Sequence, residues 1–322
     1  MSHTAQRHIL VITHVTSTVL QLSTVVHFFP FEIRRKIWSP SDPPAARLFS
    51  EPQWQEHVSL GYFLYRWLIF GLWSAFIICS LFEIGSRRPE GKKETWPIYL
   101  THWDLILGAG HTFLGAILVT KRRSLQRFPG FDPDSLTLGR IEHAYWILYT
   151  LTCSIAIGVT ILYWGTIYNP KVHTKDPLNY MMHLFNTVLI LSDLMVVGVP
   201  LRVEHVWWPL ACVIFYLIFS LFYYLAGGLD KNGYHYIYKI LDWEQPGRTL
   251  LVCLGGLLFL TFVHCTLCFF VWLRRYIRAK ATGDLWYEKT LYQIIESAVF
   301  LIVAKTYGNY TKYKYYILKL AK

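Results

Sequence analysis

The chain has 322 residues, of which 54% are hydrophobic and 16% are charged, whereas a soluble domain usually carries about 25% charged residues. Its net charge is +11, but the basic residues lie beside apolar runs and the sequence contains no nucleic-acid-binding motif, so we expect no nucleic-acid partner. These properties exclude an ordinary soluble globular protein and predict a helical membrane protein.

The N-terminal part of the chain, residues 1–59, is predicted to be a cytosolic or interfacial segment. Residues 8–31 are apolar but rich in Thr, Ser and His, which favours a helix lying on the membrane. We expect residues 33–59 to form a solvated linker because they contain Pro40, Pro43, Pro44 and Pro52.

Six apolar runs of 23 to 25 residues follow, each bounded by charged residues or by Pro and Gly. A helix of this length crosses a hydrocarbon core of about 30 Å at about 1.5 Å per residue. None of the runs alternates strictly between polar and apolar residues, which favours helices over a β-barrel. We therefore predict an all-α, polytopic membrane domain at residues 60–273, a bundle of six transmembrane helices at 60–84, 96–120, 143–167, 178–200, 206–228 and 249–273.

The basic residues predict the orientation of this domain. Alternate segments outside the six runs contain 21 and 9 Lys and Arg residues, and the richer set includes both ends of the chain. Because basic loops stay in the cytosol, both termini are predicted to be cytosolic, with loops 85–95, 168–177 and 229–248 outside or in the lumen. Within the first run, Arg66 and Glu83 are expected to reach to opposite interfaces.

Residues 274–322 are predicted to form a basic cytosolic or interfacial tail. Their apolar stretch at 291–304 is too short to span a membrane, so we expect an interfacial helix there. The sequon at Asn309 would then face the cytosol and remain unglycosylated. All six cysteines lie in apolar runs, which predicts no disulfide framework, and we expect neither a metal nor a cofactor.

Two of the six runs carry polar side chains that are costly in a lipid environment. On a helix of 100° per residue, the polar residues of each run share one face; these are Thr101, Asp104, His111 and Thr112 in run 96–120, and His183, Asn186, Thr187 and Asp193 in run 178–200. We expect the two faces to meet inside the bundle. A lower polar layer is expected from His111, Asp193 and His264.

Thr101 and His183 fall at the same predicted depth, and a hydroxyl beside a neutral imidazole is the minimum for nucleophilic acyl transfer. In that interpretation Thr101 is the nucleophile and His183 the base, Asn186 donates to the oxyanion, and Asp104 or Asp193 orients a histidine. Two alternatives remain open. The polar faces either only hold helices together, or the lower layer serves a proton or ion transporter.

Several motifs resemble the rolling stone family, named for an insect protein required in myoblast fusion. The resemblance covers about residues 50 to 280 and depends on LYRW at 64–67, YLTHWDL at 99–105, DLMVVGVPLRVEH at 193–205, AGGLD at 226–230 and YHYIYKILDWEQPG at 234–247. It implies a multi-pass membrane protein that acts in cell contact or fusion. We expect the protein in the plasma membrane or the endoplasmic reticulum. Membrane lipids are the expected partners, and no protein partner is specified.

A more distant resemblance is to the androgen-induced family of six-span hydrolases, which cleave fatty acid esters of hydroxy fatty acids with an intramembrane threonine and histidine. Leu100-Thr101 and the spacing from His183 to Thr187 match that family, whereas Leu184-Phe185 stands where a glycine is usual. This resemblance implies an alternative function, an intramembrane Thr/His lipid esterase acting on a lipid ester substrate.

Overall fold

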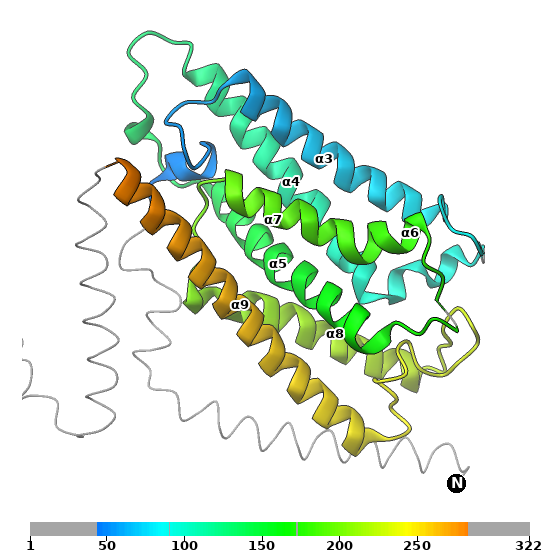
Figure 1. The fold of residues 1–322 in the computed structure, drawn as a ribbon. Helices are drawn as coiled ribbons and strands as arrows, with labels where there is room; N and C mark the ends of the chain where they lie inside the picture. Colours follow the sequence, from blue (N-terminus) through cyan, green and yellow to red (C-terminus); the bar gives the residue numbers. More distant parts are fainter. Residues whose placement is uncertain (1–43, 90, 172, 283–322) are drawn as a thin grey trace, which may run out of the picture. The chain divides into compact units, whose positions relative to one another are not determined.

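The computed structural model describes residues 44–89, 91–171 and 173–282 (Figure 1). The chain divides into two compact units, Met1–Val271 and Trp272–Lys322. Only residues 272–282 represent the second unit among the described residues, so the core, the loops and the polar contacts below all belong to the first. The predicted interfacial helices at 8–31 and 291–304 and the sequon at Asn309 lie outside the described residues.

The described residues are helical, with a single bridge between Pro52 and Val197 and no named strand, which confirms the all-α prediction. The α-helices are α3 (Leu60–Leu81), α4 (Leu100–Leu125), α5 (Arg140–Leu162), α6 (Pro177–Tyr180), α7 (Asn186–Val196), α8 (Trp207–Leu225) and α9 (Pro246–Thr282). Short 3₁₀ segments are η1 (Ala46–Phe49), η2 (Lys93–Ile98), η3 (Pro133–Ser135) and η6 (Val203–Val206), and π-helical segments are η4 (Tyr163–Ile167) and η5 (Met181–Phe185).

Five helical segments are long and apolar enough to cross a membrane, and they correspond to five of the six predicted spans. They are Leu60–Leu81, Leu100–Leu125, Arg140–Ile167, Val203–Leu225 and Pro246–Ala281. Their outward faces carry exposed Leu68, Phe222 and Phe262, whereas Arg66 and Asp104 are completely buried. Apolar side chains outside and charged side chains inside are the reverse of a soluble domain, so the protein is an integral, multi-pass membrane protein.

The predicted span at 178–200 is helical but irregular, and it is not one of those five segments. Asp176 caps its start, the π-helical η5 separates α6 from α7, and the helix ends at Val196. Pro200 has no N–H to pair with the carbonyl of Val196 one turn earlier, so the helix cannot continue. That carbonyl instead accepts a hydrogen bond from the backbone N–H of Gln53 at 2.7 Å.

Contacts between loops define the two ends of the bundle. At one end, which we call the loop end, the N–H of Arg87 donates to Asp176 at 3.0 Å and Lys92 Nζ donates to the carbonyl of Lys231 at 2.8 Å. At the other end, Gln53 contacts Val196 as described. The stretch from Pro177 to Val196 therefore runs from one end of the bundle to the other (Figure 1).

Residues 46–58, which we call the N-terminal segment, are packed against the bundle at 46–53 and at Val58, whereas residues 54–57 are exposed. Phe49 is 2% exposed and makes edge contacts with the rings of Tyr145 and Trp146. Glu51 is 3% exposed and Val58 is 1% exposed. The prediction of a solvated linker is wrong for residues 46–53 and Val58, because partners far along the chain compensate the buried polar groups there, and it holds for the exposed residues 54–57.

The helices α3 and α4 pack closely because α4 carries glycines where α3 presents large side chains. A Cβ atom at Gly108 would lie 2.3 Å from the ring of Trp73, and one at Gly115 would lie 2.0 Å from Nη2 of Arg66. Small residues that allow such approach are typical of helix pairs in membranes. Gly115 therefore leaves room for the charged side chain of Arg66 in the interior of the bundle.

Candidate functional site: a polar core inside the bundle

Asp193 of α7 and Arg66 of α3 form an ion pair in the interior of the bundle. Nη1 of Arg66 lies 2.8 Å from each carboxylate oxygen of Asp193, and both side chains are completely buried. The Tyr65 hydroxyl donates to Asp193 at 2.9 Å, and Nε2 of His111 lies 3.3 Å from it. Nη2 of Arg66 donates to the Tyr145 hydroxyl at 3.2 Å. One carboxylate thus links α3, α4 and α7.

The prediction that Arg66 reaches to an interface is wrong. Removing a charge from water is costly unless a counter-charge and hydrogen bonds compensate it, and Asp193, Tyr145 and the space at Gly115 supply these. Glu83 lies beyond the end of α3 in a turn, where its carboxylate accepts a hydrogen bond from the N–H of Gly91 at 2.7 Å.

A second polar contact joins α4 to α7 closer to the loop end. Nδ2 of Asn186 donates to Asp104 at 3.0 Å, and Oδ1 of Asn186 accepts hydrogen bonds from the N–H of Thr187 and from Thr160 of α5. The other carboxylate oxygen of Asp104 is buried without a hydrogen-bond partner. Together with the contact between His111 and Asp193, this confirms that the polar faces of the two runs meet.

Thr101 lies in the first turn of α4, at the loop end, and is 5% exposed. Next to it, the hydroxyl of Tyr238 accepts a hydrogen bond from the N–H of Leu100 at 3.1 Å. Tyr238 belongs to the aromatic loop after α8, so this loop covers the start of α4. Thr101 is therefore buried where this loop contacts α4.

His183 lies in the π-helical segment η5 and stacks on Tyr163, with ring centroids 3.4 Å apart and planes 5° apart. Its carbonyl accepts from Nε1 of Trp164 at 2.9 Å, and its Nδ1 is buried without a hydrogen-bond partner. Within the part of the chain that the structure describes, no hydrogen bond joins His183 to Thr101.

The other polar residues make the following contacts. The amide of Asn186 is bound to Asp104, and Asp193 contacts a histidine, which is His111 and not His183. The lower layer is divided as well, because His264 of α9 contacts Ser154 through Nδ1 and the carbonyl of Arg202 through Nε2, each at 2.9 Å. His264 is therefore separate from the Asp193 cluster.

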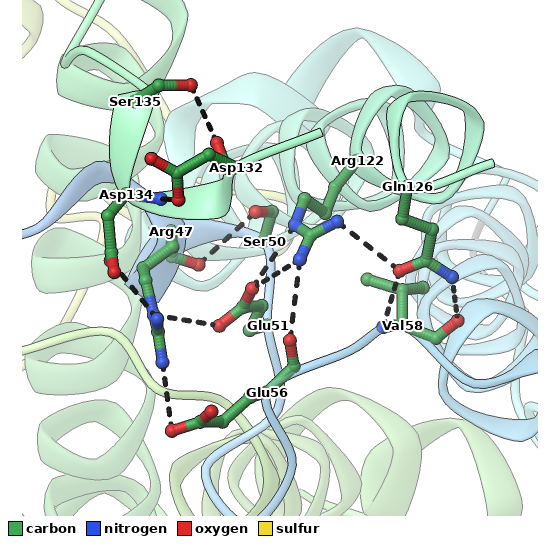
Figure 2. A network of polar contacts seen from close by, with 10 residues as sticks. All are labelled: Arg47, Ser50, Glu51, Glu56, Val58, Arg122, Gln126, Asp132, Asp134 and Ser135. Atoms are coloured by element: carbon green, nitrogen blue, oxygen red, sulfur yellow. Dashed lines mark hydrogen bonds and ion pairs between the residues drawn. The ribbon is translucent and has the colours of Figure 1, made fainter. Parts of the chain in front are cut away.

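A third polar network closes the end of the bundle opposite the loops (Figure 2). Arg122 of α4 donates to Glu51 at 2.8 and 3.2 Å, and Gln126 accepts from the N–H of Val58 at 3.0 Å. Arg47 pairs with the same Glu51 at 3.2 Å. Burial raises the pKa of Glu51, although the hydrogen bond from Arg122 and the charges of Arg47 and Arg122 oppose this rise.

The sequence analysis missed Glu51 as a partner of Arg122 because the two residues are 71 positions apart. The only available signal was the acidic residue itself, in a segment otherwise rich in proline. A pocket of ≈ 180 Å³ lies beside this network, lined by Phe49, Ser50, Leu118, Lys121, Arg122, Ser135 and Glu142 among others.

None of the described polar-core residues forms a group of three His, Cys, Asp or Glu side chains close enough to hold a metal. The one such group found in the described residues lies in the loop after α8 and contains His235, Asp242 and Glu244. The polar core is therefore a set of interhelical contacts without a metal site in its described part.

Comparison with known proteins identifies the family. A family model described as "Protein rolling stone" matches residues 32–294. The chain is also similar to "Protein rolling stone" of Drosophila melanogaster, with 31% identity over 220 residues that cover 65% of this chain and 76% of the relative. No solved structure matches. These matches lend no support to the lipid esterase alternative, and they extend over most of the described bundle. The chain belongs to the rolling stone family, as a multi-pass, all-α membrane protein.

Proposed function

We propose that this protein acts in cell contact or cell fusion as a six-span protein of the plasma membrane, and that it does so without catalysis of its own. The observation that carries the proposal is the engagement of the polar core. Asp193 is bound to Arg66, Asn186 to Asp104, and the backbone N–H of Leu100 to Tyr238. Groups that hold helices and a loop together in this way support a structural role for the polar faces.

Six crossings are supported by the contacts at the two ends of the bundle. The loop between α3 and α4 contacts both the loop after α8 and Asp176, which ends the loop between α5 and α6. These three loops therefore lie at the same end of the bundle. The stretch from Pro177 to Val196 contains 20 residues, which at about 1.5 Å each reach about 30 Å. The excess of basic residues on the opposite side favours cytosolic termini.

The test compares fusion with chemical reactivity in cells that depend on this protein. Two populations with different cytosolic dyes are mixed, and dye exchange is measured for the wild type, Thr101→Ala, His183→Ala and Arg66→Ala. We expect the first two variants to retain fusion at equal surface level, and Arg66→Ala to lose folded protein and fusion together. Thr120→Ala, which removes a hydroxyl that donates to the carbonyl of Ala116 and accepts from Nε1 of Trp67, is the matched control.

The same proteins are then labelled with a fluorophosphonate probe. We expect no labelling of the folded wild type. Labelling that Thr101→Ala and His183→Ala both remove, accompanied by loss of fusion at normal surface level, would overturn the proposal in favour of an intramembrane esterase.

A further inference from the structure

A group of three metal-ligating side chains lies in the loop between α8 and α9, remote from the polar core. Nε2 of His235 is 3.0 Å from Oδ1 of Asp242 and 3.8 Å from Oε2 of Glu244. All three ligand atoms lie within 4.8 Å of one another. We propose that these residues bind a divalent transition-metal ion, with zinc as the preferred ion, and that this ion fastens the loop to the ends of α8 and α9.

The spacing fits zinc. Zinc binds imidazole nitrogen and carboxylate oxygen at about 2.0–2.2 Å in tetrahedral geometry, which places neighbouring ligand atoms about 3.3–3.5 Å apart. Two of the three separations, 3.0 and 3.8 Å, bracket this value, and the third, between Asp242 and Glu244, is within 4.8 Å, so side-chain rotations can bring the three atoms to a common centre. A water molecule would complete the fourth position.

The donor set also selects the class of ion. Calcium and magnesium prefer sites made of oxygen ligands, whereas imidazole suits zinc and its neighbours in the first transition series. A neutral imidazole and two carboxylates carry a charge of −2 that a divalent ion neutralises. The side chains of His235 and Glu244 are 38% and 39% exposed, so an ion can reach the site from water. Without thiolates, the site is expected to exchange its ion rather than retain it permanently.

The loop holds the ligands in place before any ion arrives. Oδ1 of Asp242 accepts from the N–H of Glu244 at 3.0 Å, and the carbonyl of Asp242 accepts from Thr249 of α9 at 2.5 Å. Between the two acidic ligands, Nε1 of Trp243 donates to Ser220 of α8 at 3.1 Å. These outer contacts orient Asp242 and Glu244, which is the usual role of the groups that surround metal ligands.

His235 is positioned from the other side of the loop. Asp230 accepts hydrogen bonds from the N–H groups of Asn232 and Tyr234, which closes the turn before the histidine, and the ring of His235 lies 6.3 Å from that of Tyr224. An ion would therefore join the part of the loop at His235, beside Tyr224 of α8, to the part at Asp242–Glu244, which is bonded to Ser220 of α8 and to Thr249 of α9. Because Tyr238 lies between these parts and accepts a hydrogen bond from the N–H of Leu100, the ion would also stabilise the part of the loop that covers the start of α4.

The experiment uses the full chain in detergent, with any affinity tag removed and metal stripped by a chelator. Zinc is titrated while binding is followed by calorimetry and thermal unfolding by intrinsic fluorescence. We expect zinc to raise the unfolding temperature, and His235→Ala and Glu244→Gln each to weaken zinc binding at least about 10-fold. Asp242→Asn should weaken binding as well while keeping the acceptor for the N–H of Glu244.

His143→Ala, which removes an exposed histidine at the start of α5, should bind zinc as the wild type does. Calcium and magnesium at the same concentrations should leave the unfolding temperature unchanged. Two results would overturn the proposal. The first is a folded wild type whose unfolding temperature and heat of binding do not respond to zinc, which would leave a hydrogen bond between His235 and Asp242 without a metal role. The second is zinc binding that persists unchanged in His235→Ala.

Discussion

Asp193 receives hydrogen bonds from two neighbouring residues of α3, Tyr65 and Arg66, and lies beside His111 of α4. A carboxylate shared in this way fixes the rotation of three helices relative to one another, because each donor reaches it from one face only. The energetic consequence is asymmetric. Removing one member of a buried ion pair leaves the other charge without compensation, whereas removing both charges does not.

We therefore expect Asp193→Asn and Arg66→Gln each to destabilise the protein by about 3–5 kcal/mol. The double variant should lose clearly less than the sum of the two single losses. Thermal unfolding in detergent, with folded yield from size-exclusion chromatography, measures all three. Arg88→Gln, at an exposed arginine after α3, is the control and should resemble the wild type. Losses that simply add would mean that the two charges do not stabilise each other.

Packing between α3 and α4 gives a prediction at the scale of the element. Gly108→Ala would place a methyl group against the rigid ring of Trp73, whereas a Cβ at Gly71 of α3 meets nothing within 4 Å. Overpacking of this kind costs about 1–3 kcal/mol. Gly71→Ala should be neutral or slightly stabilising because alanine favours helices. Equal unfolding temperatures for the two variants would contradict the close approach of the helices.

The start of the stretch from Pro177 to Val196 gives a prediction about pH. Burial would raise the pKa of Asp176, but hydrogen bonds from the Thr174 hydroxyl and from the N–H groups of Arg87 and Asn179 hold the pKa below its ordinary value. A carboxyl group with a depressed pKa in the folded state stabilises the protein above its unfolded pKa, near 3.8, and this contribution is lost as the pH falls through the folded value.

Asp176→Asn should therefore lower the stability by about 0.5–2 kcal/mol at pH 7, and the difference from the wild type should shrink below about pH 4. Unfolding temperatures measured at pH 7 and pH 3.5 test this. Ser59→Ala removes the cap of α3, which carries no titratable group, so its difference from the wild type should stay constant between the two pH values. A pH-independent effect of Asp176→Asn would contradict the shifted pKa.

Five of the predicted spans could be found from the sequence because apolar length is a local property of each run. The contact between Asn186 and Asp104 was also predictable, because the helical period places each residue on the polar face of its helix. The partner of Arg66 was not, because Asp193 lies 127 positions away and nothing local distinguishes a paired arginine from one that reaches to an interface. The burial of the N-terminal segment escaped prediction for the same reason.

At the scale of the whole molecule, the number of crossings decides on which side the loop after α8 lies. The test introduces one additional cysteine at a time, in place of the exposed residues Arg88, Arg127 or Lys239. Sealed membrane vesicles that contain each variant are then labelled with a maleimide that cannot cross the membrane. With six crossings, Arg88→Cys and Lys239→Cys should react on the same side and Arg127→Cys on the other. With five crossings, Arg88→Cys and Lys239→Cys would react on opposite sides. The wild type measures the background from the native cysteines.

The N-terminal segment also has a consequence for the order of assembly. Residues 46–58 are synthesised before every helix of the bundle, yet the groups that bury them belong to later parts of the chain, Arg122 of α4 and Val196 at the end of α7. The segment has no complete binding surface until α7 has left the ribosome and entered the membrane. Residues 46–58 are the first described residues to be synthesised, yet they can pack against the bundle only after four of the proposed crossings are in the membrane. Packing of this segment is therefore a late step that requires those helices to be correctly assembled.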